Sequence, residues 1–176
     1  IRQIQRVENP RLWKEYAMKR ASMAEIGSGG RRVNVQSMKE WMRLMLHPQE
    51  AANEVLLFHG TPQQNCSIIT EQGFDERVSN RAGHFGTGIY FAENCTKSLS
   101  YCRSDDSRFL FLTRVLLGDP HFTQQANSSL RRPPNSSSTT LHDSVIGTPG
   151  RSAAHREFVT YDRTQTYPEF LIHIVP

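Results

Sequence analysis

The chain contains the stretch Val55-Leu-Leu-Phe-His-Gly-Thr61, in which an apolar run of strand length is followed by a histidine, a glycine and a threonine. A short apolar run bounded by turn residues is typical of a buried strand. A histidine in such a run must be satisfied by backbone, by another side chain or by a ligand, since an unpaired buried polar group costs about 1–3 kcal/mol. We therefore interpret His59 as a candidate site residue.

Further polar residues lie in other apolar stretches of the chain. They are Tyr90 in Phe85-Gly-Thr-Gly-Ile-Tyr-Phe-Ala92, Ser98 in Lys97-Ser-Leu-Ser-Tyr101 and Glu169 in Tyr167-Pro-Glu-Phe-Leu-Ile172. Taken singly, each is more often a structural residue whose polar group binds backbone or water. Together with His59 they predict a site.

Secondary structure follows from periodicity around these stretches. We expect helices over 9–26, 35–46, 65–72 and 96–102, and strands over 55–58, 88–92, 109–117, 157–161 and 169–175. Met38, Trp41, Met42 and Met45 are interpreted as one core-facing side of the second helix. Residues 123–140 are predicted to be a low-complexity surface loop. Helices first and strands afterwards favour an α+β fold.

Composition describes a water-soluble globular domain. The 176 residues are 37% hydrophobic and 22% charged, with no run that could span a bilayer and no signal peptide. We expect a single domain over 1–176, with 1–50 as a helical lead-in, and the missing initiator Met suggests a piece of a longer protein. Dispersed basic residues give a net charge of +4, which indicates ordinary solubility or a polyanionic ligand. An odd set of three cysteines fits a reducing, intracellular compartment, cytoplasmic or nuclear.

Common enzyme motifs are absent from the sequence. Gly83, Gly86 and Gly88 precede a strand instead of opening a helix, so they do not form a dinucleotide-binding fingerprint. They predict a tight turn or a close backbone approach to a ligand. The chain also lacks a Gly-x-Ser-x-Gly elbow, a His-Glu-x-x-His helix and a Walker loop.

Ordered motifs of the chain resemble a known family. Phe58-His-Gly-Thr61, Gly73-Phe-Asp, Phe85-Gly-Thr-Gly-Ile-Tyr-Phe-Ala-Glu93, Lys97-Ser98 with Tyr101-Cys102, and Tyr167-Pro-Glu-Phe-Leu-Ile172 are similar to the catalytic domain of the poly(ADP-ribose) polymerases, the diphtheria-toxin-like ADP-ribosyltransferases. The sequence motifs are most similar to those of the tankyrase and macrodomain-containing branches of this family. The resemblance implies two packed, mainly antiparallel sheets with peripheral helices, and NAD+ as co-substrate.

The resemblance also implies roles at the nicotinamide end of NAD+. His59 would bind the adenosine ribose hydroxyl, and the backbone of Gly60 would hold the nicotinamide carboxamide with help from Ser98. Tyr101 and Tyr90 would stack on the two faces of the ring, which suits a planar cation.

Four more residues receive roles from the resemblance. Thr61 and Asn65 would line the adenosine end, and Lys97 would lie near the active centre. Glu169 matches the catalytic glutamate, whose carboxylate would stabilise an oxocarbenium-like ribose. The structural alternative for Glu169 is an edge-strand carboxylate exposed to water.

Departures from the family limit what the resemblance implies. Val78 and Asn80 stand where tankyrases carry ring side chains, which leaves adenosine contacts open. The segment between Tyr101 and Phe109 lacks zinc ligands, so no metal is expected. The part before His59 is too short for the autoinhibitory helical domain of the DNA-dependent enzymes.

We therefore expect an ADP-ribosyltransferase with His59, Tyr90 and Glu169 as catalytic residues. Its acceptors would be protein side chains such as Glu, Asp, Ser or Cys, including its own, and the His-Tyr-Glu set is compatible with poly(ADP-ribose) elongation. The alternatives are single transfer, a silent NAD-binding or ADP-ribose-binding module, or transfer to nucleic acid ends. Arg131 and Arg132 lie in the loop that would help to choose acceptors. We expect a monomeric domain without membrane contact.

Overall fold

Two four-stranded sheets form the body of the protein in the computed structural model, which describes residues 1–79, 83–102, 106–148 and 155–175. The first, here called sheet A, has the order β1-β8-β4-β2, with strands Gln3–Arg6, Thr166–Ile174, Arg108–Leu116 and Glu54–Thr61. The second, sheet B, has the order β3-β7-β6-β5, with strands Ile89–Phe91, Glu157–Thr160, Ser144–Gly147 and Pro120–Thr123. Every pairing is antiparallel except β5 with β6. The α+β expectation and the two mainly antiparallel sheets are confirmed.

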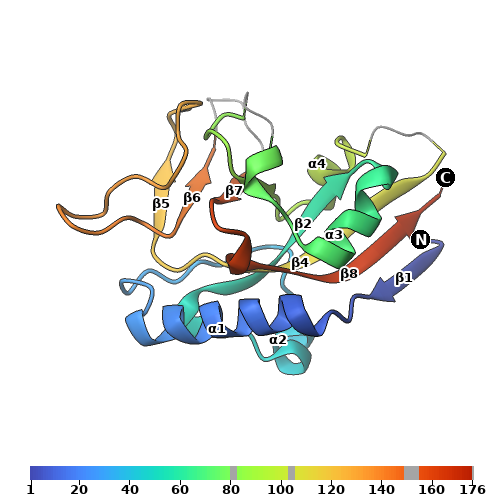
Figure 1. Ribbon diagram of the computed structural model, residues 1–176, viewed down its shortest axis with the longest axis horizontal. Helices are drawn as coiled ribbons and strands as arrows, with labels where there is room; N and C mark the ends of the chain where they lie inside the picture. The colour runs from blue at the N-terminus through green and yellow to red at the C-terminus, as the bar shows by residue number, and fades with distance from the viewer. Residues whose placement is uncertain (80–82, 103–105, 149–154, 176) are drawn as a thin grey trace.

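Helices surround the two sheets (Figure 1). The α-helices are α1, Pro10–Ile26; α2, Glu40–Leu46; α3, Cys66–Gln72; and α4, Cys95–Leu99. Short 3₁₀-helices are η1, Glu50–Ala52; η2, Gln63–Asn65; η3, Glu76–Val78; and η4, Arg163–Gln165. In Figure 1, α1 runs along one side of sheet A, while α3 and α4 lie on the other side.

Helix α1 follows the pattern expected from the sequence. The Asn9 side chain accepts a hydrogen bond from Leu12 N–H and so caps the helix, and Pro10 occupies the first turn. Leu12, Tyr16 and Met23 are buried against the sheet. The helix ends at Gly27, whose φ of 79° favours glycine.

Helix α2 is shorter than predicted, and its apolar residues do not share one face. The helix begins at Glu40 rather than near residue 35. Met38 and Met42 are buried, but Trp41 is 59% exposed and Met45 is 72% exposed. The core-facing prediction is wrong for these two, because a helix of two turns presents only the Met42 side to the sheet.

The two sheets are joined where β2 passes β3. Phe58 N–H donates to the Ala92 carbonyl at 2.8 Å, and Ala92 N–H donates to the Phe58 carbonyl at 3.0 Å. Phe91, Phe111 and Phe158, all buried, belong to one core cluster that draws on both sheets. Residues flanking the Phe58–Ala92 bridge therefore lie at the seam between the sheets.

Several strands escaped the sequence prediction. All residues of β1 are exposed, so β1 has no alternating pattern to detect. The short strands β5 and β6 are also new, and β6 includes Ser144 and Val145 of the motif Asp143-Ser-Val145. Apart from Thr123 at the end of β5 and an isolated bridge between Asn135 and Leu141, the stretch 123–140 has no strand or helix, as expected for a surface loop.

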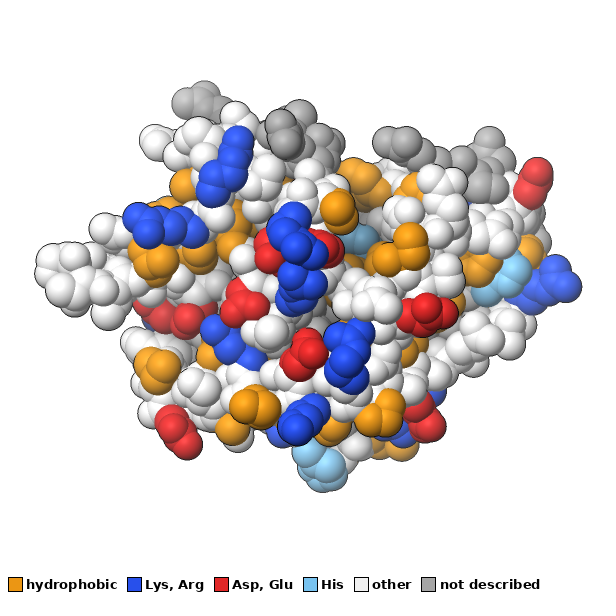
Figure 2. All heavy atoms as spheres, in the orientation of Figure 1, with side chains coloured by type: hydrophobic (Ala, Val, Ile, Leu, Met, Phe, Trp, Pro, Cys, Tyr) orange, Lys and Arg blue, Asp and Glu red, His pale blue; other side chains and the backbone are white. Residues whose placement is uncertain are grey.

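The face of the molecule drawn in Figure 2 shows no separation of charge by sign. On the face drawn in Figure 2, acidic and basic side chains are interspersed over the helices and loops. Among the helices that the structure describes, none combines the length and the apolar character required to cross a bilayer. The net charge of +4 is therefore not gathered into one patch on this face.

Candidate active site

His59 lies near the end of β2, with its ring edge-on to Phe74 and close to Phe91. Its Nδ1 is 2.8 Å from the Tyr90 carbonyl oxygen. A carbonyl can only accept, so Nδ1 carries the hydrogen and donates. Burial lowers the pKa of His59 more than this hydrogen bond raises it, so the neutral ring is favoured. Nε2 then keeps its lone pair and can accept a hydrogen bond from a hydroxyl.

Gly60 has backbone N–H and C=O groups on the open edge of β2, two residues after the Phe58–Ala92 bridge. Backbone groups two residues apart in a strand point the same way, and those of Phe58 face Ala92. The N–H and C=O of Gly60 therefore face outward from the open side of β2. A Cβ at this position would lie 1.7 Å from the Ser98 carbonyl oxygen, so only glycine allows α4 to pack here.

Ser98 lies at the same edge. Its side chain is buried, and its hydroxyl donates to the Phe58 carbonyl at 3.0 Å. The hydroxyl oxygen can still accept a hydrogen bond. The structure thus places Ser98 beside the outward-facing backbone of Gly60.

Tyr90 holds the turn that precedes its own strand. Its hydroxyl accepts from Phe85 N–H at 2.9 Å and donates to the Gly86 carbonyl at 2.7 Å. Burial is the main cause that raises the pKa of Tyr90 to about 12, and the charge of Glu157 adds to it. An electrostatic contribution from Tyr101, which is 56% exposed, also raises this pKa.

A buried carboxylate beside these residues belongs to Glu157, the first residue of β7. In the β3–β7 pair Tyr90 lies opposite Val159, so Tyr90 and Glu157 share one face of sheet B. Lys97 Nζ is 2.6 Å from Glu157 Oε1. Oε2 has no hydrogen-bond partner and lies 3.6 Å from His84 Nδ1. A buried carboxylate oxygen without a hydrogen bond is costly and marks a candidate ligand position.

Helix α4 connects the two halves of this site. Ser98 binds β2 through the Phe58 carbonyl, and the neighbouring Lys97 binds β7 through Glu157. Asn94 caps the helix by accepting from Thr96 N–H. The helix therefore fixes His59 and Gly60 relative to Tyr90 and Glu157.

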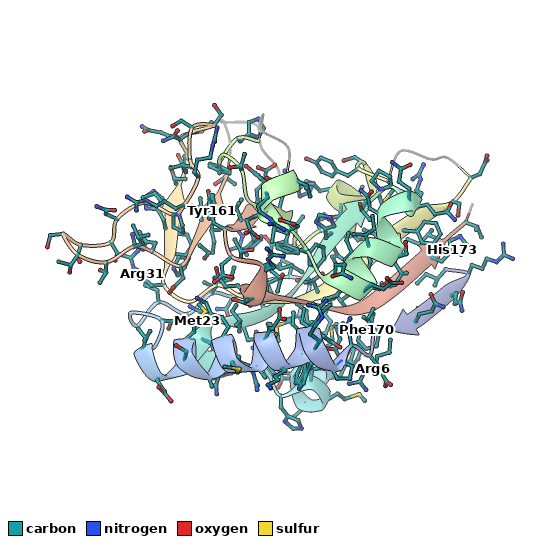
Figure 3. The ribbon with its side chains drawn as sticks, viewed as in Figure 1. Arg6, Met23, Arg31, Tyr161, Phe170 and His173 are labelled. Atoms are coloured by element: carbon teal, nitrogen blue, oxygen red, sulfur yellow. The ribbon has the colours of Figure 1, made fainter. Side chains whose placement is uncertain are left out.

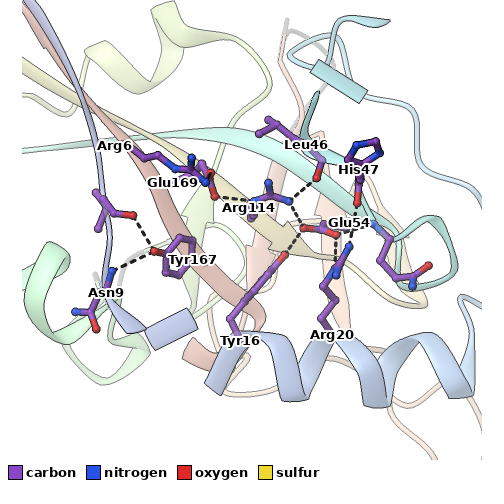
Figure 4. A network of polar contacts seen from close by, with 12 residues as sticks. Arg6, Asn9, Tyr16, Arg20, Leu46, His47, Glu54, Arg114, Tyr167 and Glu169 are labelled. Carbon is purple, nitrogen blue, oxygen red and sulfur yellow. Dashed lines mark hydrogen bonds and ion pairs between the residues drawn. The ribbon is translucent and has the colours of Figure 1, made fainter. Parts of the chain in front are cut away.

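The structure does not bring Glu169 to this site, and its predicted catalytic role is not supported. Its Oε2 accepts from Arg114 Nε at 2.7 Å, and its Oε1 lies 3.4 Å from Arg6 Nη2 (Figure 4). Arg114 pairs with Leu56, whereas His59 pairs with Phe111, so Arg114 and His59 lie on opposite faces of sheet A. The pairing of β4 with β8 is irregular at Glu169: Leu112 pairs with Phe170 and Thr113 with Pro168, so Glu169 has no partner on β4. This irregularity turns the Glu169 side chain to the face of sheet A that carries Arg114.

The Glu169 carboxylate is part of a buried ion network beneath α1. Arg114 also donates to Glu54 at 2.9 Å, and Glu54 further accepts from Tyr16 at 2.8 Å and Arg20 at 2.7 Å. In Figure 4 these side chains converge from α1 and sheet A. Figure 3 shows Arg6 of this network well apart from Tyr161, which follows the strand that carries Glu157. Each anion of this network is paired with cations on the α1 side, and Glu169 Oε1, like Glu157 Oε2, makes no hydrogen bond.

The sequence did contain a signal for Glu157. Residues 157–161 were predicted as a strand, and Glu157 is a charged residue that opens an otherwise apolar run. Glu169 has the same appearance within its own strand. Local pattern alone cannot separate them, because the face to which each points depends on register.

The remaining candidates are placed as follows. Asn65 Nδ2 donates to the buried Thr61 Oγ1 at 3.1 Å, so the two predicted adenosine-end residues contact each other. Val78 is 81% exposed. Asn80 lies outside the described residues, as does part of the segment after Tyr101 that was considered for zinc. Within the described residues, no group of three or more His, Cys, Asp or Glu side chains could hold a metal.

Comparison with known proteins shows the family to which the chain is similar. A family model described as the poly(ADP-ribose) polymerase catalytic domain matches residues 1–175. The protein mono-ADP-ribosyltransferase PARP12 of Mus musculus is 31% identical over 178 residues, which cover 98% of this chain and 21% of that protein.

Two human relatives show similar identity. The protein mono-ADP-ribosyltransferase PARP11 of Homo sapiens is 30% identical over 196 residues, covering 98% of this chain and 50% of the relative. The protein mono-ADP-ribosyltransferase PARP14 of Homo sapiens is 30% identical over 180 residues, which cover 98% of this chain and 8% of that protein. The chain thus spans half or less of the length of each of these relatives.

Proposed function

The chain belongs to the poly(ADP-ribose) polymerase catalytic-domain family, a family of NAD-dependent ADP-ribosyltransferases, and we propose that it transfers single ADP-ribose units to protein side chains. The observation that carries the proposal is the buried Glu157 carboxylate. One oxygen binds Lys97, and the other has no hydrogen bond on the face of sheet B that carries Tyr90.

The described residues fit NAD+ as the co-substrate. The outward N–H and C=O of Gly60 match the two hydrogen-bonding groups of a carboxamide, and the Ser98 hydroxyl lies beside them. The neutral His59 ring offers Nε2 as an acceptor for a ribose hydroxyl. Tyr101 and Tyr90 provide aromatic surface for the nicotinamide ring, and Thr61 and Asn65 remain proposals for the adenosine end.

In this proposal Glu157 takes the role that the resemblance assigned to Glu169. When the bond between nicotinamide nitrogen and ribose C1′ breaks, the electron pair leaves with neutral nicotinamide and positive charge develops on the ribose. A buried carboxylate stabilises that charge more strongly than water can. Lys97 holds one carboxylate oxygen and so leaves the other to face the ribose.

Single transfer is preferred over elongation on the basis of the relatives. The sequence, with His59, Tyr90 and Glu169, is compatible with poly(ADP-ribose) synthesis. The names of the matching relatives do not support that step, because PARP12, PARP11 and PARP14 are each named mono-ADP-ribosyltransferases. We therefore propose that the product carries one ADP-ribose per acceptor residue.

Incubation with labelled NAD+ and intact mass analysis tests the proposal. We expect mass increments of one ADP-ribose per modified site, together with release of nicotinamide. Longer ladders would replace single transfer by elongation. A heat shift on adding NAD+ without nicotinamide release would contradict the enzyme and indicate a binding module instead.

A further inference from the structure

His84 lies at the open side of Glu157. Its side chain is 59% exposed, while that of Glu157 is 6% exposed. Nδ1 of His84 is 3.6 Å from Glu157 Oε2, the carboxylate oxygen that makes no hydrogen bond. Such a separation is common at catalytic pairs that tighten only when substrate binds.

The turn that carries His84 is firmly held. Tyr90 Oη binds Phe85 N–H and the Gly86 carbonyl, and Gly86 N–H donates to the Gly83 carbonyl at 3.1 Å. The His84 carbonyl accepts from Asn127 N–H at 2.7 Å, which ties the turn to the loop after β5. A Cβ on Gly86 would lie 1.9 Å from the Leu130 carbonyl oxygen, so this contact requires glycine. His84 is therefore an exposed side chain on a fixed backbone.

We propose that His84 and Glu157 form an imidazole–carboxylate pair in which His84 accepts the proton of an acceptor hydroxyl, so that this domain modifies serine or threonine side chains. The inference rests on the proposed function and deepens it by naming the acceptor class. Glu157 Oε2 faces Nδ1, which fixes the hydrogen there and leaves the Nε2 lone pair available to an incoming hydroxyl.

The chemistry of transfer explains why the acceptor class depends on a base. The bond from ribose C1′ to nicotinamide breaks, the electron pair leaves with nicotinamide, and a bond from C1′ to the acceptor oxygen forms. A hydroxyl acceptor must also lose its proton, which passes to His84 Nε2 and then to water. A carboxylate acceptor is already ionised at neutral pH and needs no base. His84 thus favours hydroxyl acceptors over carboxylates.

The neighbouring groups are less suited to take this proton. Lys97 is a cation bound to Glu157 Oε1 at 2.6 Å and has no lone pair to offer. Glu157 Oε1 binds Lys97, and Oε2 belongs to a side chain that is only 6% exposed, whereas the His84 side chain is 59% exposed and meets an incoming acceptor first. Among the described residues, the charged partner of His84 is Glu157 from β7, and Lys97 from α4 meets it only through that carboxylate. A neutral imidazole has a nitrogen lone pair that can take a proton from a hydroxyl, and histidine is the side chain most often used as a general base.

Two peptides of one sequence, differing only in a single Ser or Glu acceptor, test the proposal. Modification and nicotinamide release are measured with labelled NAD+ across pH for the wild type and for His84→Gln. His121→Gln is the matched control, because His121 lies on β5 beside His142 and not at Glu157. His84→Ala is assayed with and without added imidazole.

We expect wild type to modify the Ser peptide, and His84→Gln to lower the Ser-to-Glu rate ratio by about 10²-fold or more. The Ser rate alone should rise with pH in wild type, and imidazole should restore part of it in His84→Ala. An unchanged ratio in His84→Gln, or a wild type that modifies only the Glu peptide, would overturn the inference while leaving the proposed function standing. If the wild type releases no nicotinamide with either peptide, the proposed function fails and this inference with it.

Discussion

Glu157 and Glu169 are two buried carboxylates with nearly the same coordination and different chemistry. Each has one oxygen on a cation, 2.6 Å from Lys97 and 2.7 Å from Arg114 respectively. Each has a second oxygen near an exposed side chain, 3.6 Å from His84 and 3.4 Å from Arg6. Arginine stays charged and does not exchange protons, whereas histidine does so near neutral pH. The partners, rather than the carboxylate, distinguish a structural pair from a reactive one.

The largest effect is expected from Glu169→Gln. Arg114 would lose one anionic partner in a buried network, and breaking such a pair costs about 3–5 kcal/mol. Urea unfolding should show this loss of stability. The rate of nicotinamide release per folded molecule should stay at the wild-type value, and a selective loss of that rate in a stable protein would restore Glu169 as the catalytic residue.

Glu157→Gln should show the converse behaviour. Nicotinamide release should fall by about 10²–10³-fold, the range for removal of one group that stabilises transition-state charge. Unfolding by urea should change less than in Glu169→Gln, because Lys97, which is 21% exposed, can turn to water, whereas Arg114, which is 7% exposed, stays buried. Equal activity of this variant and wild type would remove Glu157 from the mechanism.

Gly60→Ala is expected to disturb the surroundings of Glu157 and to leave those of Glu169 unchanged. The new Cβ would collide with the Ser98 carbonyl and displace α4, which carries Lys97 to Glu157. Overpacking of this kind costs about 1–3 kcal/mol. We expect reduced NAD+ affinity by calorimetry, while the Glu169 network on the other face of sheet A is unaffected. Ser67→Ala on α3, an exposed position, is a suitable control.

Acid unfolding should separate the two regions by pH. Burial lowers the pKa of His59 more than its hydrogen bond to Tyr90 raises it. The contribution of the neutral ring to the free energy of unfolding is therefore complete above the pKa of unfolded histidine, about 6.5, and declines as the pH falls below that value. Burial alone would raise the pKa of Glu54, but hydrogen bonds from Gln49, Arg114 and Tyr16 outweigh it and lower the pKa. Stability from the Glu54 network is therefore lost later, as pH falls below about 4.3.

Each group contributes a slope of at most about 1.4 kcal/mol per pH unit, which makes this the smallest effect. Urea midpoints measured from pH 8 to pH 3 would show it. His59→Gln should remove the upper decline and keep the lower one. A single transition with one slope would contradict the separation of the two regions.

The sequence was sufficient for the elements with strong local patterns. Helix α1 has a capping Asn9 and an apolar stripe, and the core strands β2, β4 and β8 have long apolar runs. His59 and Tyr90 were found because each interrupts such a run. The exposed β1 lacks a pattern of this kind, since its position comes from pairing with β8.

Our proposal places the catalytic glutamate at Glu157 instead of Glu169, and the reason is non-local. Glu157 and Glu169 each lie in an apolar strand, and the motif around Glu169 resembled the family more closely. The choice depends on which face each side chain occupies, and that is set by the irregularity opposite Leu112 and Thr113 and by the pairing of β7 with β3. Register of this kind depends on partners far away in the chain, which no window of sequence contains.

The bridge between Phe58 and Ala92 has a consequence for measurement. Its two amides hold sheet A, with His59 and Gly60, against sheet B, with Tyr90 and Glu157. A ligand that contacts both sheets adds a second link across the same seam, so opening the seam would require its release. Hydrogen exchange at these two amides should therefore slow in proportion to ligand occupancy. Their exchange rate would then measure ligand binding without an assay of turnover.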